Sequence, residues 1–228
     1  MKLYHRLTEA SFVRRLHRFA ADVQLDGQLH TVHVKNTGRL GELLIPGARV
    51  WLEESDNPAR KTRYDLVCVE NRGHVVNIDS LAPNRIFREF AQAGGWLPEI
   101  TELRGEVTRG DSRFDFAYSR YGIPGFIEVK GVTLFDDAGC AFFPDAPTER
   151  GVKHLHGLIQ AQREGCECGV CFILQRDGVI GFQPHDLRHP AFGQALREAA
   201  AAGVIIRAIG CHVTPESCSA CYEVPVIL

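Results

Sequence analysis

The chain has 228 residues, which exceeds one average domain and allows two. Hydrophobic residues make up 45% and charged residues 24%, so the sequence can bury a core and is not a disordered chain. No apolar run approaches the roughly 18 residues that cross a bilayer, and Met1 to Val23 lacks the apolar stretch of a secretory signal. We therefore expect a cytoplasmic protein that does not contact membranes. Its eight cysteines are expected as thiols or metal ligands, not disulfides.

The net charge of −2 conceals an uneven distribution. Residues 1–64 contain 11 Lys and Arg against 7 Asp and Glu. The basic residues of this segment include Arg14, Arg15, Arg18, Lys35, Arg39, Arg60, Lys61 and Arg63. Such clustering suits a surface that follows nucleic-acid phosphates, and the alternative is an ordinary solvated face.

The first 80 residues predict short β-strands. Residues 19–25 and 29–35 flank Asp26-Gly27, a dipeptide typical of a tight hairpin. Three more strands, separated by turn residues, are expected near 48–54, 62–70 and 73–79. Five short strands without helical periodicity predict a small barrel, which an oligonucleotide-binding (OB) fold and an SH3-like fold both fit.

The rest of the chain alternates helices and strands. Asn84 is expected to cap a helix that stops at Gly94-Gly95. There follow strands near 103–108, 113–119 and 125–134, a helix near 148–164, a strand at 168–175, a helix near 188–202 and a strand at 204–209. This order predicts a mixed α/β sheet covered by helices. The expected domains are 1–82 and 83–228, packed closely because no linker separates them.

The most informative stretch runs from Glu106 to Thr133. Glu128 and Lys130 point to the same face of one predicted strand, because alternate residues of a strand share a face. If the preceding strand pairs with it as a hairpin, Asp115 lies beside them, and Glu106 could join from the element before. Charges buried on a central strand cost roughly several kcal/mol each unless they are paired or bind metal.

These residue types suit phosphodiester hydrolysis. Glu106, Asp115 and Glu128 would bind Mg²⁺ or Mn²⁺ through oxygen atoms. Lys130 would orient or deprotonate the attacking water and stabilise charge that develops on phosphorus. The set matches the D…(D/E)-x-K core of nucleases, and the alternative is an ordinary salt bridge on an exposed strand face.

Further motifs occur in a specific order along the chain: His33-Val-Lys-Asn36-Thr-Gly38-Arg39, Leu44-Ile-Pro46-Gly47, Asn57-Pro-Ala-Arg60-Lys61, Ser112-Arg113-Phe-Asp115-Phe, Glu128-Val-Lys130-Gly-Val-Thr133 and Phe143-Pro-Asp145-Ala-Pro-Thr-Glu-Arg150-Gly-Val-Lys-His154. In these stretches the sequence resembles the sugar fermentation stimulation protein family of bacteria and archaea. The resemblance implies a five-stranded OB-like barrel joined to a restriction-endonuclease-like, PD-(D/E)XK α/β domain, with non-specific DNA binding. It also implies that Asp115, Glu128 and Lys130 form the nuclease motif, with Glu106 at its upstream acidic position.

Candidate contacts to nucleic acid lie in both parts of the chain. In the barrel they are Lys35, Asn36, Arg39, Arg60 and Lys61, where neighbouring glycines let backbone approach a strand and Arg39 can grip phosphate or stack on bases. In the second part they are Arg113, Arg150, Lys153 and His154. The last three share one side of the predicted helix, opposite its apolar side. A solvated helix face is the alternative.

Two cysteine pairs have the spacing of zinc ligands. They are Cys168-x-x-Cys171 and Cys218-x-x-Cys221. Cys168 and Cys171 begin an apolar strand, however, and residues three apart on a strand face opposite sides. Zinc is therefore not expected.

Together these patterns predict a DNA-binding protein that acts as a metal-dependent nuclease, with RNA as the alternative substrate. A non-catalytic, DNA-binding regulator of sugar metabolism genes is the competing function. A purely structural protein is the third alternative, and a homo-oligomer is compatible with all of them. The intact set of Asp115, Glu128 and Lys130 favours the enzyme, because a structural core would gain from apolar residues at these positions.

Overall fold

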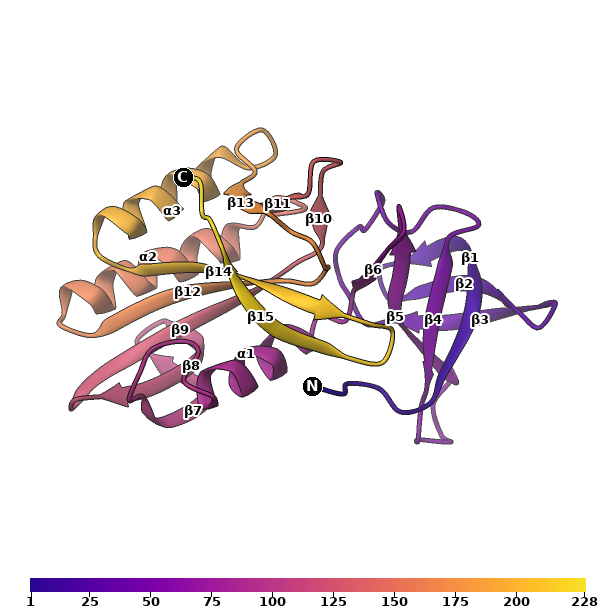
Figure 1. Ribbon diagram of the computed structural model, residues 1–228, viewed down its shortest axis with the longest axis horizontal. Coiled ribbons are helices and arrows are strands. Elements are labelled where there is room, and N and C mark those ends of the chain that lie inside the picture. The colour runs from indigo at the N-terminus through magenta and orange to yellow at the C-terminus, as the bar shows by residue number, and fades with distance from the viewer.

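The computed structural model describes all 228 residues as two adjoining domains (Figure 1). The first is built from β1 (Leu7–His17), β2 (Ala20–Leu25), β3 (Gln28–Val34), β4 (Arg49–Glu54), β5 (Tyr64–Asn71) and β6 (His74–Asn77). These strands form a sheet in the order β3-β2-β1-β4-β5-β6, and β3 also pairs with β5. This extra pairing closes five strands into a ring, so the predicted five-stranded barrel is confirmed.

The five strands of the ring are not the five that the sequence predicted. β1 was missed, and β6 was counted although in this sheet it pairs only with β5. Along β1 the inward-facing Ala10 and Phe12 are buried, but Glu9 precedes them and Arg14 and Arg15 follow them. A strand with one solvated face carries such charges, and here they hide the two-residue apolar period.

The second domain follows the predicted order of helices and longer strands. Its elements are α1 (Ala82–Gln92), β7 (Thr101–Arg109), β8 (Ser112–Arg120), β9 (Ile123–Val132), β10 (Leu134–Phe135), β11 (Cys140–Phe143), α2 (Glu149–Arg163), β12 (Glu167–Leu174), β13 (Gly181–Pro184), α3 (Pro190–Ala201), β14 (Ile205–Val213) and β15 (Cys218–Val224). The main sheet has the order β15-β14-β12-β9-β8-β7, with β9, β12 and β14 parallel. The short strands β10, β11 and β13 form a separate small sheet. These three strands and β15 were not predicted.

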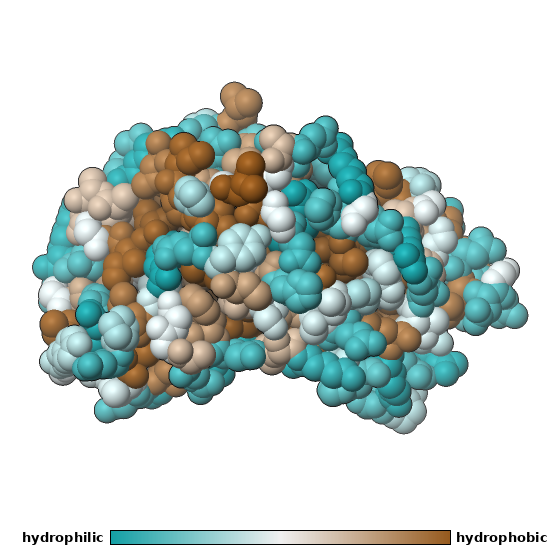
Figure 2. All heavy atoms as spheres, viewed as in Figure 1, coloured by the Kyte–Doolittle hydropathy of each residue, from teal (hydrophilic) through white to brown (hydrophobic).

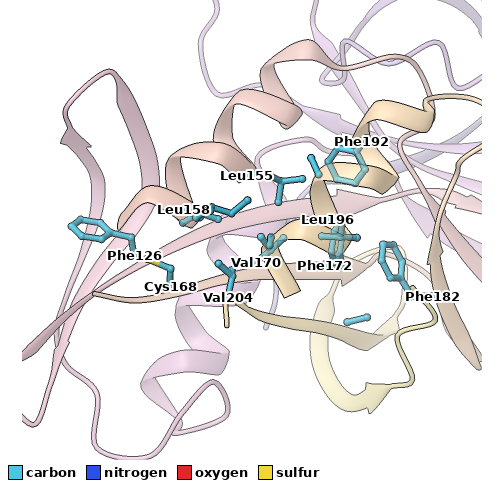
Figure 3. Close-up of a cluster of buried hydrophobic side chains, with 14 of the residues drawn as sticks. Phe126, Leu155, Leu158, Cys168, Val170, Phe172, Phe182, Phe192, Leu196 and Val204 are labelled. Carbon is cyan, nitrogen blue, oxygen red and sulfur yellow. The ribbon is translucent and has the colours of Figure 1, made fainter. Parts of the chain in front are cut away.

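Helices cover both faces of the main sheet. α2 and α3 lie on one face, where Leu155, Leu158 and Leu196 pack over Val170 and Phe172 of β12 (Figure 3). α1 packs on the other face, against β9, β12 and β15. Because it is covered on both sides, β12 is buried along almost its whole length. Each fully buried Val, Phe, Ile or Leu side chain of this strand contributes roughly 1.5–3 kcal/mol by leaving water.

The start of α1 differs from the prediction. The helix begins at Ala82, and Asn84 lies in its first turn instead of capping it. Pro83 suits this position because a first-turn residue needs no hydrogen bond from its own nitrogen. The side chain of Asn84 is therefore free to serve another purpose. In α2, by contrast, Thr148 is the cap and accepts a hydrogen bond from the Gly151 amide at 3.0 Å.

The two domains share one apolar core. Leu3, Tyr4, Trp51 and Cys68 belong to the same buried cluster as Phe87 of α1 and residues of β9 and β12. This contact confirms the close packing expected from the sequence.

The N-terminal ends of α1 and α2 are the ends that lie nearest the barrel (Figure 1). In the view of Figure 2, apolar surface gathers over the second domain around α3 and β14, and the barrel surface is mostly hydrophilic. No helix is both long enough and apolar enough to span a membrane.

Candidate active site

The predicted acids and the lysine converge on one hollow. β8 and β9 form the expected antiparallel hairpin, with Phe116 opposite Ile127, and this register sets Asp115 beside Glu128. Asp115 Oδ2 accepts a hydrogen bond from the Val129 amide at 2.8 Å. The hollow has a volume of about 530 Å³. Its lining includes Glu106, Asp115, Glu128 and Lys130 together with Asn84, Arg113, Arg150 and His154.

Glu128 is buried in the middle of the sheet and has one oxygen without a partner. The residue is 2% exposed. Its Oε1 accepts hydrogen bonds from Lys130 Nζ and from His154, whereas Oε2 is buried without any hydrogen-bond partner. Burial favours a higher pKa, but His154 and Lys130 together outweigh it and hold the pKa of Glu128 below its usual value. Glu128 therefore stays ionised, and its Oε2 lacks a hydrogen bond.

His154 is not on the open side of α2 where the sequence placed it. It is 8% exposed and contacts Glu128. Arg150 Nε donates to its Nε2 at 3.3 Å, so the proton of the neutral ring lies on Nδ1 and is donated to Glu128. The helical spacing grouped His154 with Arg150 and Lys153 correctly, but it could not show that a strand covers part of this side. The predicted phosphate contact is instead a partner of the buried carboxylate.

Asp115 has a raised pKa for two reasons. Burial is the larger cause and the charge of Glu128 is the second, while the Val129 amide, Asn84 and Lys130 act in the opposite direction. Asn84 Nδ2 donates to Asp115 Oδ1 at 3.1 Å. Sequence reasoning missed this role, and its only signal was a polar side chain just after the proline in the first turn of α1. A bound cation would relieve the electrostatic repulsion between two carboxylates held together in this way.

Glu106 borders the hollow but lies at its rim. Its side chain is 72% exposed and pairs with Arg113 Nη2 at 2.6 Å. Its backbone adopts a left-handed φ of 56°, which turns the chain at this point of β7. No three His, Cys, Asp or Glu side chains gather closely enough to hold a metal ion between them. The structure thus brings together Asp115 and Glu128, and not the three carboxylates that the sequence led us to expect.

Two of the predicted barrel contacts are free. Arg39 and Lys61 are exposed, and neither takes part in an ion pair within the chain. Arg39 borders a second hollow, of about 590 Å³. This hollow shares Thr37 and Ser80 with the one that contains the carboxylates. The two hollows are therefore adjacent, with Thr37 and Ser80 on their common border.

The other three barrel contacts are used inside the protein. Lys35 Nζ pairs with the buried Asp79 at 2.9 Å, and Arg60 makes a two-point pair with Asp65, with its shorter bond at 2.6 Å. Asn36 donates to a backbone carbonyl at 2.8 Å and accepts from a backbone amide at 2.7 Å. These contacts hold the barrel and its loops in place. Sequence spacing identified the cations but not their partners.

The remaining predicted contacts are spread over two hollows. Arg113 and Arg150 are exposed at the hollow of the carboxylates. Lys153 is exposed one turn further along α2 and borders a third hollow, of about 430 Å³, with Ser112 and His156. Arg150 and Lys153 are therefore neighbours on one helix but border different recesses.

The cysteines are packed as thiols. All eight are free. Cys168 belongs to the core beneath α2 and α3, and Cys171 belongs to the core beneath α1, so they face opposite sides of β12 as predicted. Burial raises the pKa of Cys168 to about 12. A protonated, buried thiol of this kind behaves as a small apolar side chain.

Comparison with known families covers both domains. Residues 13–78 match the family described as the SfsA N-terminal OB domain. Residues 81–217 match the family described as the sugar fermentation stimulation protein RE domain. The barrel is therefore an OB barrel, and the SH3-like alternative is wrong.

Comparison with individual proteins agrees over the whole length. A sugar fermentation stimulation protein homolog from Desulfitobacterium hafniense is 46% identical over 217 residues, covering 95% of this chain and 94% of that protein. The homolog from Clostridium acetobutylicum is 42% identical over 231 residues, covering 100% of both. A solved structure, that of Pyrococcus furiosus SfsA in complex with Ca²⁺, superposes with a TM-score of 0.91 at 29% identity and covers 100% of this chain and 98% of that one. The chain belongs to the sugar fermentation stimulation protein family.

Proposed function

We propose that this protein binds nucleic acid, DNA in the first place, and hydrolyses its phosphodiester bonds with a divalent cation held at Asp115 and Glu128. The observation that carries the proposal is the buried, unpartnered Oε2 of Glu128 beside a second carboxylate at an open hollow. A purely structural salt bridge would leave no buried oxygen unsatisfied, because such an atom costs free energy. The hairpin that carries Asp115, Glu128 and Lys130 supports a restriction-endonuclease-like assignment.

The donor set fits a hard divalent cation such as Mg²⁺ or Mn²⁺. Such ions take carboxylate oxygens and complete their coordination with water and substrate phosphate, so two acidic side chains suffice. The description of the Pyrococcus furiosus relative as a Ca²⁺ complex supports this, since Ca²⁺ also prefers oxygen ligands. When bound, the cation would neutralise charge on the phosphate and polarise it for attack. Glu106, at the rim, would lie beside the bound substrate and would not coordinate the ion.

Lys130 is the residue that we assign to the attacking water. Its side chain is largely buried, and its ammonium donates to Glu128 while bordering the hollow. At this position it can orient a water molecule and offset negative charge that develops on phosphorus. Arg113 and Arg150 at the rim are placed to hold flanking phosphate oxygens, for which the planar guanidinium is well suited.

The supporting residues keep the carboxylates in one geometry. Asn84 and the Val129 amide each hold one oxygen of Asp115. His154 and Lys130 both hold Oε1 of Glu128, which leaves Oε2 for the cation. The first turns of α1 and α2, which supply Asn84 and Arg150, add partial positive charge that favours an anionic substrate.

The competing function is a DNA-binding regulator that does not cut. The exposed position of Glu106 favours it, because only two carboxylates converge. Both functions require that the barrel surface binds nucleic acid. Only the nuclease also requires that the site of Lys130 hydrolyses it. Cleavage therefore discriminates between them.

The test is incubation of the pure protein with labelled single- and double-stranded DNA and RNA, in Mg²⁺, Mn²⁺ or chelator. Wild type is expected to cut in a cation-dependent manner. Lys130→Met keeps much of the apolar stem, and we expect it to bind normally but to cut about 10²-fold or more slowly, the scale of a lost proton-transfer group. Lys2→Met is the matched control, because Lys2 is exposed and does not border the hollow.

Three results are informative. Cleavage that Lys130→Met abolishes and Lys2→Met preserves supports the nuclease. Binding by wild type without cleavage in any cation would leave the regulator as the function. Cleavage retained by Lys130→Met would assign the activity to another site or to a contaminant.

A further inference from the structure

An exposed aromatic ring lies on the barrel at the turn between β1 and β2. Phe19 is 48% exposed, and its ring stacks on that of His33 with centroids 6.5 Å apart and planes 21° apart. His33 Nδ1 lies 2.8 Å from Asp65 Oδ1, and Asp65 in turn accepts two hydrogen bonds from Arg60. The ring pair is thus ordered before any ligand arrives, while about half of the Phe19 surface stays open to solvent.

Two cations without carboxylate partners border a hollow next to the turn that carries this ring. Arg18 directly precedes Phe19, and together with Arg39 it borders the hollow of about 590 Å³. Both are exposed and neither joins an ion pair within the chain. Arg15 Nη2 braces the surrounding loops by donating to the carbonyls of Arg18 and, at 3.0 Å, Asn36. Two cations on braced loops are therefore available to an anionic ligand.

The loop that carries Arg39 is docked against the second domain. A Cβ at Gly38 would lie 2.6 Å from Asp145 Oδ2, so a larger residue would force the Asp145 side chain to shift. Thr37, its neighbour, borders both this hollow and the one with the carboxylates. Arg18, the neighbour of Phe19, therefore borders a hollow that adjoins the one with the carboxylates.

We propose that Phe19 and His33 form a base-stacking subsite for single-stranded nucleic acid, whose backbone passes Arg18 and Arg39 toward the carboxylates. Only a base released from its duplex neighbours offers a free face to an aromatic ring, and OB barrels combine such rings with backbone-tracking cations. A single exposed Phe is common on protein surfaces and by itself indicates no ligand. The stack of Phe19 on His33, together with unpaired cations nearby, is what indicates a binding site here. The direction of the backbone rests on the proposed function, whereas stacking requires no cleavage.

The experiment measures affinity by fluorescence anisotropy in the presence of chelator. Three probes are used: a labelled oligothymidylate, a duplex of equal length, and an abasic strand with the same number of phosphates. Phe19→Ala is expected to weaken binding of oligothymidylate about 5- to 100-fold, the range for loss of one stacked base, and to leave the other two probes within about twofold. Leu29→Ala removes another exposed apolar side chain of the barrel, 60% exposed, and is expected to change none of them.

An aromatic replacement supplies the rescue and a spectroscopic signal. Phe19→Trp is expected to bind oligothymidylate like wild type. Trp51 and Trp96 are buried, so a base cannot stack on either of them. A change in emission would therefore come from the new indole, which oligothymidylate should quench and the abasic strand should not.

Several outcomes overturn the inference. Stacking is excluded if Phe19→Ala binds oligothymidylate as tightly as wild type does. It is also excluded if Phe19→Ala loses as much affinity for the abasic strand as for oligothymidylate. A loss on the duplex as large as on the single strand removes the preference for single strands. If wild type binds no nucleic acid, the subsite and the proposed function both fail. If Phe19→Ala loses single-strand affinity although wild type cuts nothing, the subsite stands and only hydrolysis fails.

Discussion

Two buried carboxylates of this protein have similar burial and opposite surroundings. Asp79 is 1% exposed and Glu128 is 2% exposed, and each pairs with a lysine. Around Asp79 every oxygen has partners: Lys35 at 2.9 Å, Tyr4 Oη at 3.3 Å and the amide of Leu81 at 2.9 Å. Around Glu128 both donors crowd onto Oε1, and Oε2 has none.

The difference separates a structural clamp from the site proposed to bind the cation. Asn77 Nδ2 donates to Tyr4 Oη at 2.8 Å, and Gln175 Nε2 donates to Asn77 Oδ1 at 3.0 Å. These contacts extend the Asp79 network from the N-terminal segment through the barrel to the end of β12. A fully satisfied polar network in a low dielectric specifies one packing arrangement, whereas an unsatisfied buried atom raises the free energy of the folded state. Such an atom at an open hollow indicates a ligand.

The largest stability effect is expected at the clamp. Asp79→Ala leaves Lys35 and Tyr4 without their acceptor, and breaking a buried pair costs about 3–5 kcal/mol of unfolding free energy. Urea unfolding monitored by circular dichroism measures this. Asp111→Ala is the control, because Asp111 is exposed and unpaired, and about 0.5 kcal/mol or less is expected there. An equally small change at Asp79 would show that the network does not hold the domains together.

The next effect concerns the cation. If Asp115 and Glu128 hold a divalent ion, Ca²⁺ or Mg²⁺ at a hundred times its Kd should stabilise the folded protein by about 2.7 kcal/mol. For a chain of this size that corresponds to a rise in Tm of roughly 5–10 °C. Thermal unfolding with and without chelator checks the rise, which Glu128→Gln should abolish. A rise of the same size in Glu128→Gln would place the ion elsewhere.

A smaller effect, of opposite sign to that at Asp79, is expected at Asp115. Burial and the charge of Glu128 raise the pKa of Asp115 above its value in the unfolded chain, so its ionised form destabilises the fold. Asp115→Asn should therefore stabilise the metal-free protein at neutral pH, by about 0.5–2 kcal/mol. The gain should disappear as the pH falls through the folded pKa toward the ordinary value of 3.8. Thermal unfolding in chelator from pH 4 to pH 8 measures it. A destabilised Asp115→Asn at pH 7 would contradict this account.

Much of the fold could be predicted from local patterns. The hairpin at Asp26-Gly27, the two later helices and the buried strand of Cys168 to Leu174 are where periodicity and turn residues put them. β1 could not be found, because the charges of its solvated face hide its apolar face. β10 and β11 are too short to show a period, and β11 also pairs with β13, which only the folded chain brings near.

The candidate site could be predicted where it depends on strand geometry and not where it depends on packing. Asp115, Glu128 and Lys130 lie together as their spacing required. Glu106, which the same reasoning included, lies at the rim. His154 and Asn84 were placed on a phosphate surface and at a helix cap, and both instead hold the carboxylates.

The sequence by itself determined which side chains share a strand or helix face, because the two-residue and 3.6-residue periods are local properties of the backbone. Only the tertiary structure decided which charges are free to act. Lys35 and Asp79 are distant in sequence, and so are His154 and Glu128, which lie 26 residues apart. A charge is neutralised or left available by partners within a few ångströms, and those partners are brought there by the packing of α1, α2 and the barrel around the sheet.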